Sequence, residues 1–294
     1  MNTIVSVIVT THNRLSFLEE AINSVVNQSF KNYEIIVVND HKETDKSVKN
    51  VLGVYGNIKL IENYSNPGAN FSRNIGIKQS LGEYIAFLDD DDIWDKEYLE
   101  KQMANIYNNN LDLSYTGYVE YWDTNPPVEI PISATPVPND LVNKMASGNF
   151  CPETTSAVVV KKCALESVDG FDTELNSFQD WDLWFRLAKL YKFGCENEPL
   201  IKFRQHMGVR TSVDYSRRIS GLEQINSKWG HEITKDFKSK FLLGCYYSNA
   251  KKFAMFGYLK ECFKVLISKR EFYCTKTGIL MATEVLYKLM KYKI

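Results

Sequence analysis

Four consecutive aspartates, Asp89–Asp92, follow the apolar run Tyr84–Leu88. Such a run predicts a buried strand, so the four carboxylates would crowd together at its carboxyl end. Their mutual repulsion would be offset by a hard divalent cation. The run therefore predicts a metal site; the alternative is a solvated turn whose charges serve the amino end of the next helix.

The aspartate run does not have the pattern of a calcium loop. Counting from Asp89, the fifth residue is Ile93 and the sixth is Trp94, where an EF-hand needs an oxygen ligand and a glycine. We expect instead a few protein ligands in a cleft, with substrate phosphates or water completing the metal shell.

Strand and helix patterns alternate through the first hundred residues, which predicts a parallel α/β sheet. Strands are expected over 4–9, 33–38, 58–61 and 84–88, with helices from residue 15 and over 44–52, 70–80 and 96–107. Ligands of such sheets bind outside the carboxyl ends of the strands. Thr10–Arg14, Asn39–Asp40 and the aspartate run each follow a strand, so we expect them to face one site.

Two other nucleotide sites are excluded by the first turn. Thr10–Leu15 contains no glycine, so the G-x-G-x-x-G pattern of dinucleotide binding is absent. A P-loop is absent as well.

Length and composition are those of a globular protein with a large core: 294 residues, 44% hydrophobic and 24% charged. The six cysteines show no paired spacing, which favours reduced thiols. Without a recognisable secretory signal or an apolar stretch long enough for a membrane span, we expect a cytoplasmic protein.

The net charge of −1 hides an asymmetry. Residues 228–294 contain 14 Lys and Arg against five Asp and Glu, so they carry +9 and residues 1–227 carry −10. Basic and aromatic residues together suit an anionic membrane surface, at the inner face of the plasma membrane; the alternative is a helical subdomain with a solvated lysine face. No nucleic-acid motif accompanies the charge, so nucleic acid is not an expected partner. Five prolines over 126–138 predict an irregular, mobile loop over the cleft.

An ordered set of motifs over roughly residues 4–212 resembles glycosyltransferase family 2. The motifs are Ser6–Arg14, Val37–Asp40, Gly68–Gly76, Phe87–Asp92, Gly170–Asp172 and Gln179–Trp184. The resemblance implies a GT-A fold, a Rossmann-like and mostly parallel central sheet flanked by helices. It also implies a catalytic domain over 1–220, with a nucleotide-binding half to about 110 and an acceptor-side half over 111–220. A basic, aromatic-rich helical subdomain would follow over 221–294.

The resemblance assigns the donor site to residues that match the family's motifs. Thr10, His12 and Arg14 belong to the loop that borders the nucleotide, and Asp40 resembles the carboxylate that accepts a hydrogen bond from a uracil-like ring. Arg73 resembles the contact to the base or the diphosphate; its alternative is an exposed helix residue. Asp91 resembles the metal ligand of the D-x-D region, and Asp89 or Asp90 the ribose contact. His206 resembles a late histidine that completes the metal shell or touches the diphosphate, with a structural role as its alternative. Asp92 is expected to face the following helix and to do no chemistry.

The resemblance makes Asp180 the base that takes the proton of the acceptor hydroxyl. Asp182 is its nearest rival, although on a helix it should face elsewhere, and a helix-cap role for Asp180 is the alternative. Gln179 departs from the family's usual glutamate, which removes a negative charge beside Asp180. Trp184 is expected in the core.

The resemblance thus implies an inverting enzyme that depends on a metal ion, Mn²⁺ or Mg²⁺. It would move a sugar from a nucleotide diphosphate donor, UDP above all, to a hydroxyl of a saccharide acceptor. The acceptor could be lipid-linked, in bacterial surface polysaccharide assembly. The alternatives are a nucleotidyltransferase on a similar sheet and a non-catalytic sugar-nucleotide binding protein.

Overall fold

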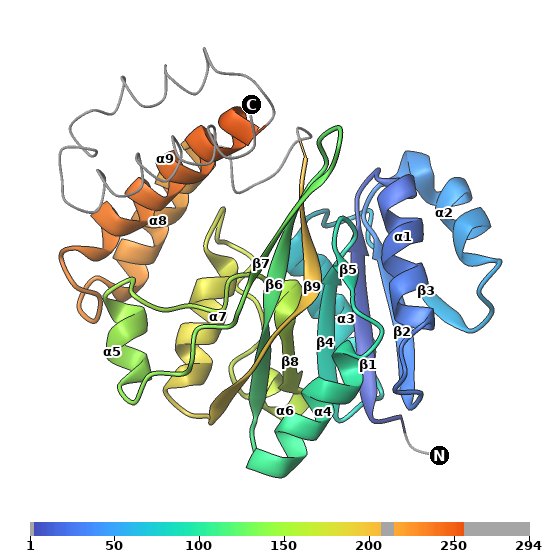
Figure 1. The fold of residues 1–294 in the computed structure, drawn as a ribbon, viewed down its shortest axis with the longest axis horizontal. Helices are drawn as coiled ribbons and strands as arrows, with labels where there is room; N and C mark the ends of the chain where they lie inside the picture. Colours follow the sequence, from blue (N-terminus) through green and yellow to red (C-terminus); the bar gives the residue numbers. More distant parts are fainter. Residues whose placement is uncertain (1–2, 207–214, 256–294) are drawn as a thin grey trace.

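The computed structural model describes residues 3–206 and 215–255 (Figure 1). The strands are β1 (Val5–Thr11), β2 (Tyr33–Asn39), β3 (Ile58–Glu62), β4 (Tyr84–Asp89), β5 (Ile93–Trp94), β6 (Leu113–Trp122), β7 (Val128–Ile132), β8 (Val158–Lys161) and β9 (Phe193–Gln205). The helices are α1 (Leu15–Val26), α2 (Asp45–Leu52), α3 (Ala69–Gln79), α4 (Tyr98–Asn109), α5 (Leu141–Ala146), α6 (Lys162–Ser167), α7 (Gln179–Ala188), α8 (Tyr215–Trp229) and α9 (Phe237–Met255). Two 3-10 turns cover Lys42–Thr44 and Thr155–Ala157.

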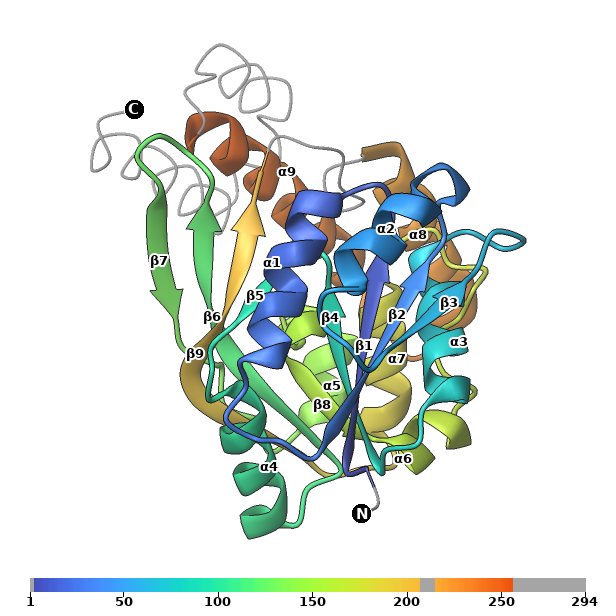
Figure 2. The same cartoon turned by 90° about the vertical axis from the view of Figure 1, so that its right-hand side faces the viewer.

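In the described part of the chain these strands form one mixed sheet in the order β3-β2-β1-β4-β8-β6-β9-β5, and β7 pairs with β6. The first four strands are parallel, and β1, β2 and β4 point toward the same edge (Figure 2). The strand β8 is antiparallel to both of its neighbours, whereas β6 and β9 are parallel. The predicted α/β sheet is therefore confirmed, with the antiparallel strand β8 between the parallel strands β1 to β4 and the strand β6.

The two faces of the sheet hold two hydrophobic cores, because alternate strand residues point to opposite sides. Val7 and its neighbours on one face pack with α1, α2 and α4. Ile8 and Phe87 on the other face pack with α3 and with α5 to α8. The helix α3 approaches β1 closely at Gly76, where a Cβ atom would lie 2.5 Å from Cγ2 of Ile8. A side chain at position 76 would therefore push α3, and the Arg73 that it carries, away from the sheet.

The proline-rich segment 126–138 is irregular only in part, because its middle forms a strand. Val128–Ile132 forms β7, which pairs antiparallel with β6 and places Pro131 opposite Val119. Proline lacks the N–H that a central strand needs but is tolerated on an edge strand. The segment does border the cleft described below, through Ile132 and Thr135.

The helices α8 and α9 lie at the other end of the sheet from β1 to β3, close to α5 and α7 (Figure 1). Leu222 and Ile225 of α8 and Phe237 of α9 are buried in the same core as α7. The described part of the C-terminal segment therefore packs directly on the sheet-bearing body of the protein. The predicted domain boundary at residue 220 falls inside α8.

Candidate active site

The carboxyl ends of β1, β2 and β4 meet, as the alternating pattern predicts. Thr10 of β1 is in register with Asp89 of β4, and Thr11 with Asn39 of β2. These ends open on a cleft of about 860 Å³. Nine of the predicted site residues line it: Thr10, His12, Arg14, Asp40, Arg73, Asp89, Asp90, Asp91 and Asp180. We call the part formed by the ends of β1, β2 and β4 and by Arg73 the strand wall, and the part formed by the start of α7 and by α8 and α9 the helix wall.

Asp90 is bound to the loop that follows β1. Its Oδ2 accepts hydrogen bonds from Thr11 Oγ1 at 2.8 Å and from the His12 N–H at 3.3 Å, and its Oδ1 accepts from Arg14 Nη1 at 3.0 Å. Burial of the carboxyl group raises the pKa of Asp90 to about 7. The positive charge of Arg14 opposes this rise, and the negative charges of Asp91 and Asp89 add to it. These bonds hold the predicted nucleotide loop against the aspartate run.

Asp40 joins the same loop to the start of α3. Its Oδ1 lies 2.6 Å from His12 Nδ1, and its Oδ2 accepts from the Gly68 N–H at 2.7 Å. Gly68 has a φ of 132°, which other residues rarely adopt. The carboxylate of Asp40 therefore lies at the mouth of the cleft, between two backbone segments that could border a planar base.

Arg73 is not an exposed helix residue. It is 5% exposed, its Nη2 donates to Asp89 Oδ1 at 2.5 Å, and its guanidinium lies 5.3 Å from the centre of the Phe171 ring. Its Nη1 is buried without a hydrogen-bond partner among the described residues. An unpaired buried donor is costly, so this group is suited to an acceptor atom supplied by a ligand.

The Gly170–Asp172 motif holds α3 in place. Asn74 Nδ2 donates to the Phe171 carbonyl and Asn74 Oδ1 accepts from the Phe171 N–H, both at 2.8 Å. Gly170 has a φ of 65°, and a Cβ atom there would lie 2.5 Å from Asn74 Oδ1. The motif thus acts by positioning the helix that carries Arg73.

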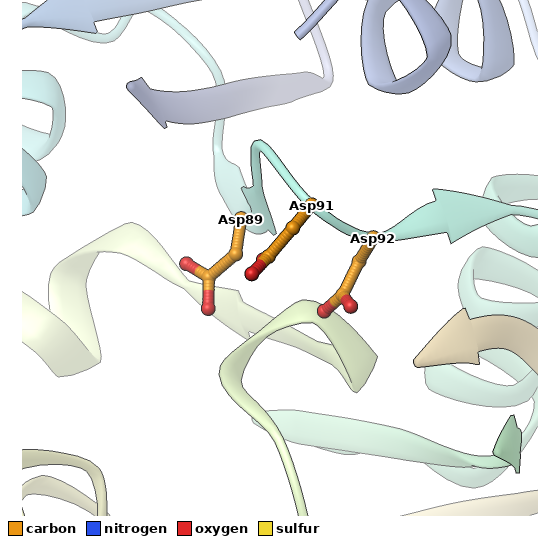
Figure 3. A group of neighbouring side chains, drawn as sticks. All are labelled: Asp89, Asp91 and Asp92. Carbon is orange, nitrogen blue, oxygen red and sulfur yellow. The ribbon is translucent and has the colours of Figure 1, made fainter. Parts of the chain in front are cut away.

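Asp89, Asp91 and Asp92 offer oxygen atoms that all lie within 4.8 Å of one another. Their side chains point to the same side of the turn between β4 and β5 (Figure 3). His206 Nε2 lies 3.1 Å from Asp91 Oδ2, which also accepts from Arg14 Nη1 at 2.8 Å. Carboxylate oxygens with one nearby imidazole are a ligand set that suits Mn²⁺ or Mg²⁺, so the residues fit the predicted metal.

The expected orientation of Asp92 is wrong. Asp92 is 1% exposed, belongs to the carboxylate group, and its Oδ1 accepts from the backbone N–H of Arg204 in β9 at 3.1 Å. It therefore faces the cluster and β9 rather than the following helix. The sequence could not reveal this because β9 is distant in the chain and was not predicted as a strand.

Asp180 lies in the first turn of α7 and lines the cleft across from the strand wall. The residue that caps this helix is Phe178, so Asp180 is not the N-cap. Phe178 has a φ of 63°, a left-handed conformation that is uncommon outside glycine and often found at functional sites. Trp181 and Trp184 are at most 1% exposed, which confirms the prediction that Trp184 belongs to the core.

The geometry can be compared with that of known proteins. A model of one protein family, glycosyl transferase family 2, matches residues 6–165. The chain belongs to this family. The match covers β1 to β4 and the aspartate run, whereas Asp180, His206 and the helices α8 and α9 lie beyond it.

Curated relatives of the chain are named as uncharacterized glycosyltransferases. A glycosyltransferase of Rickettsia conorii is 30% identical over 253 residues, which are 82% of this chain and 39% of that protein. One from Methanocaldococcus jannaschii is 32% identical over 210 residues, 68% of this chain and 70% of the relative. One from Rickettsia typhi is 28% identical over 99% of this chain and 92% of its own length. The chain spans about two fifths of the length of the R. conorii protein and nearly all of the R. typhi protein.

Solved structures show the fold. S. aureus TarS 1-349 in complex with UDP-GlcNAc is 20% identical, with a TM-score of 0.59 over 92% of this chain and 80% of that chain. Mannosyltransferase PcManGT from Pyrobaculum calidifontis, in complex with GDP-Man and Mn²⁺, is 17% identical, with a TM-score of 0.58 over 98% of this chain and 81% of that chain. This family 2 glycosyltransferase therefore has the predicted GT-A fold.

Asp182, the rival of Asp180, is a structural residue in this glycosyltransferase. It is fully buried, and its carboxylate contacts Arg186 and Lys228 and accepts from Trp229 Nε1 at 2.8 Å. It ties α7 to α8 and faces away from the cleft, as its position on the helix predicts.

Two acidic residues of the cleft were missed by the sequence analysis. Glu153 lies in the loop before β8, and Glu120 in β6. Desolvation by the cleft walls raises the pKa of Glu153, and the charges of Glu120 and Asp180 raise it further, although solvent reaches the residue. No motif contains Glu153, so only the fold could bring it near Asp180.

The predicted membrane role of residues 228–294 falls largely on 256–294, outside the described residues. In the described part, Lys240, Lys251 and Lys252 line the cleft, and Lys251 Nζ donates to both carboxylate oxygens of the buried Glu120. These three lysines therefore do not belong to the solvated lysine face that was the alternative to a membrane role, whereas Lys235 and Lys238 are exposed. Within the described ranges, no helix combines the length and apolarity needed to cross a membrane.

Proposed function

We propose that this glycosyltransferase moves a sugar with inversion from a UDP-sugar to a hydroxyl of a saccharide acceptor, with Mn²⁺ or Mg²⁺ as cofactor. The observation that carries the proposal is one cleft with a carboxylate cluster and Arg73 on the strand wall and a single helix-borne carboxylate, Asp180, on the helix wall.

The strand wall is suited to a nucleoside diphosphate. Asp40 would accept from a ring N–H of the base, while Thr10, His12 and Arg14 border the nucleoside. Arg73, with a buried N–H to spare, would contact the base or the diphosphate, since a guanidinium presents several donors in a fixed plane. Support for a nucleotide-sugar donor comes from structural neighbours solved with UDP-GlcNAc and GDP-Man.

Asp89, Asp91 and Asp92 would hold the cation, with His206 beside Asp91. A bound Mn²⁺ or Mg²⁺ would neutralise the charge that develops on the departing nucleoside diphosphate. Asp89 and Asp90 remain the proposed ribose contacts, with Asp89 also orienting Arg73.

Asp180 would act as the base. Inversion needs a carboxylate on the face of the sugar opposite the leaving diphosphate, where it removes the proton of the attacking hydroxyl. Asp180 lines the cleft from the start of α7, whereas the proposed diphosphate contacts belong to the strand wall. Glu153, in the loop before β8, interacts with the charge of Asp180, and its carboxylate would replace in part the negative charge that is lost because position 179 is a glutamine.

The test is transfer and donor hydrolysis with a panel of nucleotide sugars and Mn²⁺, comparing the native enzyme with Asp91→Ala and Asp180→Ala. We expect both variants to lose transfer, and Asp180→Ala to keep UDP binding by calorimetry. Unchanged turnover in both variants would overturn the site assignment. UDP binding without any turnover of the native chain would instead support a sugar-nucleotide binding protein.

Membership of the family leaves the nucleotidyltransferase without support. We propose a role in bacterial surface polysaccharide assembly on the family resemblance alone. We propose binding at a membrane surface through residues 228–294 on the charge of that segment alone. Liposome sedimentation of the full chain and of a chain ending at residue 255 tests the membrane part, and equal binding would contradict a role for residues 256–294.

A further inference from the structure

The cations that line the cleft differ in their partners. Arg14 and Arg73 on the strand wall are each bound to aspartates, and Lys251 is bound to Glu120. Arg218 and Lys240 on the helix wall contact only uncharged groups among the described residues. Two cations without a carboxylate partner among the described residues therefore belong to the helix wall, which also carries the proposed base.

Arg218, in α8, is half-buried against the start of α7. Its guanidinium carbon lies 4.0 Å from the centre of the Phe178 ring, and its Nη1 lies 3.5 Å from Ser177 Oγ, the limit of a weak hydrogen bond. Its Nε is buried without a hydrogen-bond partner in the described part of the chain. A partly desolvated guanidinium with an unpaired N–H is costly in free energy unless an anion meets it.

Lys240, in α9, directly precedes Phe241, whose ring packs against the ring of Phe178. Its Nζ donates to the Ser147 carbonyl at 3.1 Å and to Asn149 Oδ1 at 2.8 Å. The rings of Phe178 and Phe241 are 5.0 Å apart and connect the surroundings of Arg218 to those of Lys240. An ammonium group has three N–H donors, so one remains for a group in the cleft.

We propose that Arg218 and Lys240 form a subsite for a phosphate group carried by the acceptor. This inference rests on the proposed function, because it assumes that the helix wall receives the acceptor. The donor diphosphate does not explain these cations, since its proposed contacts belong to the strand wall, whereas α8 and α9 lie on the opposite side of the molecule from β1 to β3 (Figure 1).

The subsite lies beside Asp180 rather than on it. Arg218 contacts Ser177 and Phe178, which precede Asp180 in the chain, so a phosphate held there would set the distance between the neighbouring sugar hydroxyl and the base. Lys252 also lines this wall and adds to its positive potential, whereas Glu153 and Asp180 would repel an anion placed directly against them.

Two sources of such a phosphate are chemically distinct: a phosphorylated saccharide and the diphosphate of an isoprenoid carrier.

The experiment is calorimetry on the full chain already loaded with UDP and Mn²⁺, titrated with a hexose 1-phosphate, with the same hexose unphosphorylated, and with farnesyl diphosphate. The variants are Arg218→Gln and Lys240→Gln. Lys238→Gln is the matched control, since it removes the same charge from the exposed side of α9.

We expect one of the two phosphate probes to bind the native protein more tightly than the free hexose. Each cleft variant should weaken that binding about tenfold, the size of a lost charge-assisted hydrogen bond, with Lys238→Gln unchanged. The hexose 1-phosphate or the farnesyl diphosphate, whichever binds, then identifies the source.

The proposal is overturned if neither phosphate binds the UDP-loaded protein, or if the cleft variants bind as the native protein does. Lys240→Gln keeps the test valid even if Arg218→Gln does not fold, because it leaves every contact of Arg218 in place. Failure of UDP and Mn²⁺ to bind at the outset would reject the proposed function itself, a result distinct from a phosphate that fails to bind the loaded enzyme.

Discussion

The two walls of the cleft carry their charges in different ways. On the strand wall, each arginine is bound to aspartates of the same wall, as Arg73 is to Asp89 and Arg14 is to Asp90 and Asp91. On the helix wall, Asp180 and the cations of α8 and α9 belong to different segments of the chain, and Arg218 has no acidic partner among the residues that the structure describes. The charged residues of the strand wall come from short sequence motifs and are paired with one another. Those of the helix wall are brought together only by tertiary packing. Under the proposed function, the strand wall would bind the donor and the helix wall would bind the acceptor.

The largest expected effect is on the helix wall. Asp180→Asn keeps the shape of the side chain but removes the proposed base, so the rate of transfer should fall by about 10²–10⁴-fold. UDP affinity should change little, because the strand wall is untouched. Steady-state kinetics with calorimetry of UDP checks this, and Glu174→Gln, an exposed acid in the loop before α7, is the control. A similar loss of UDP affinity would place Asp180 in the donor site instead.

Asp91→Asn should affect the strand wall. Replacing one ligand removes negative charge where the cation is proposed to bind, so Mn²⁺ affinity should fall by about 10–100-fold, and transfer should become dependent on high Mn²⁺. Calorimetry of Mn²⁺ in the presence of UDP measures this directly. Asp95→Asn, an exposed aspartate just beyond β5, should bind the metal normally; equal affinity in all three proteins would remove Asp91 from the ligand set.

Arg73→Lys tests the arrangement of donors rather than the charge. Lysine carries all its donors on one nitrogen, so it cannot occupy both the Nη2 position beside Asp89 and the Nη1 position that is proposed to meet the ligand. UDP affinity should therefore fall about tenfold. The exposed Lys78→Gln on the same helix serves as the control in UDP titrations. Native affinity in Arg73→Lys would show that only the positive charge matters at this position.

The smallest expected effect is on stability, through Glu153. Because the pKa of Glu153 is raised in the folded state, its ionisation is less favourable there than in the unfolded state and lowers the stability of the fold near neutral pH. This cost is absent at a pH where the carboxyl is protonated in both states. Glu153→Gln should therefore raise Tm at pH 7 by at most a few degrees, because solvent reaches the residue. The gain should shrink as the pH falls toward the unfolded-state pKa of glutamate. Thermal melts across this pH range check the sign, and a variant that is less stable at pH 7 would contradict it.

Much of the nucleotide-binding half could be predicted because its information is local. The alternation of apolar runs and helical spacing identifies β1 to β4, and the parallel arrangement then brings Thr10, Asn39 and Asp89 to one edge. The strand β9 was not predicted, and Asp92 was consequently misplaced, since its partner Arg204 is 112 residues away in the chain. The strand β7 was hidden by Pro131, whose usual meaning as a strand breaker does not hold on an edge.

The sequence by itself determined the α/β class, the carboxylate cluster after β4 and the family, because short-range periodicity and ordered motifs encode them. Only the tertiary structure decided that Asp182 is a buried tie between α7 and α8, that Glu153 lies near Asp180, and that Arg218 and Lys240 share one wall. The physical reason is that the charge of a side chain is evident in the sequence, but its counter-ion and its exposure to water depend on which distant segments pack around it.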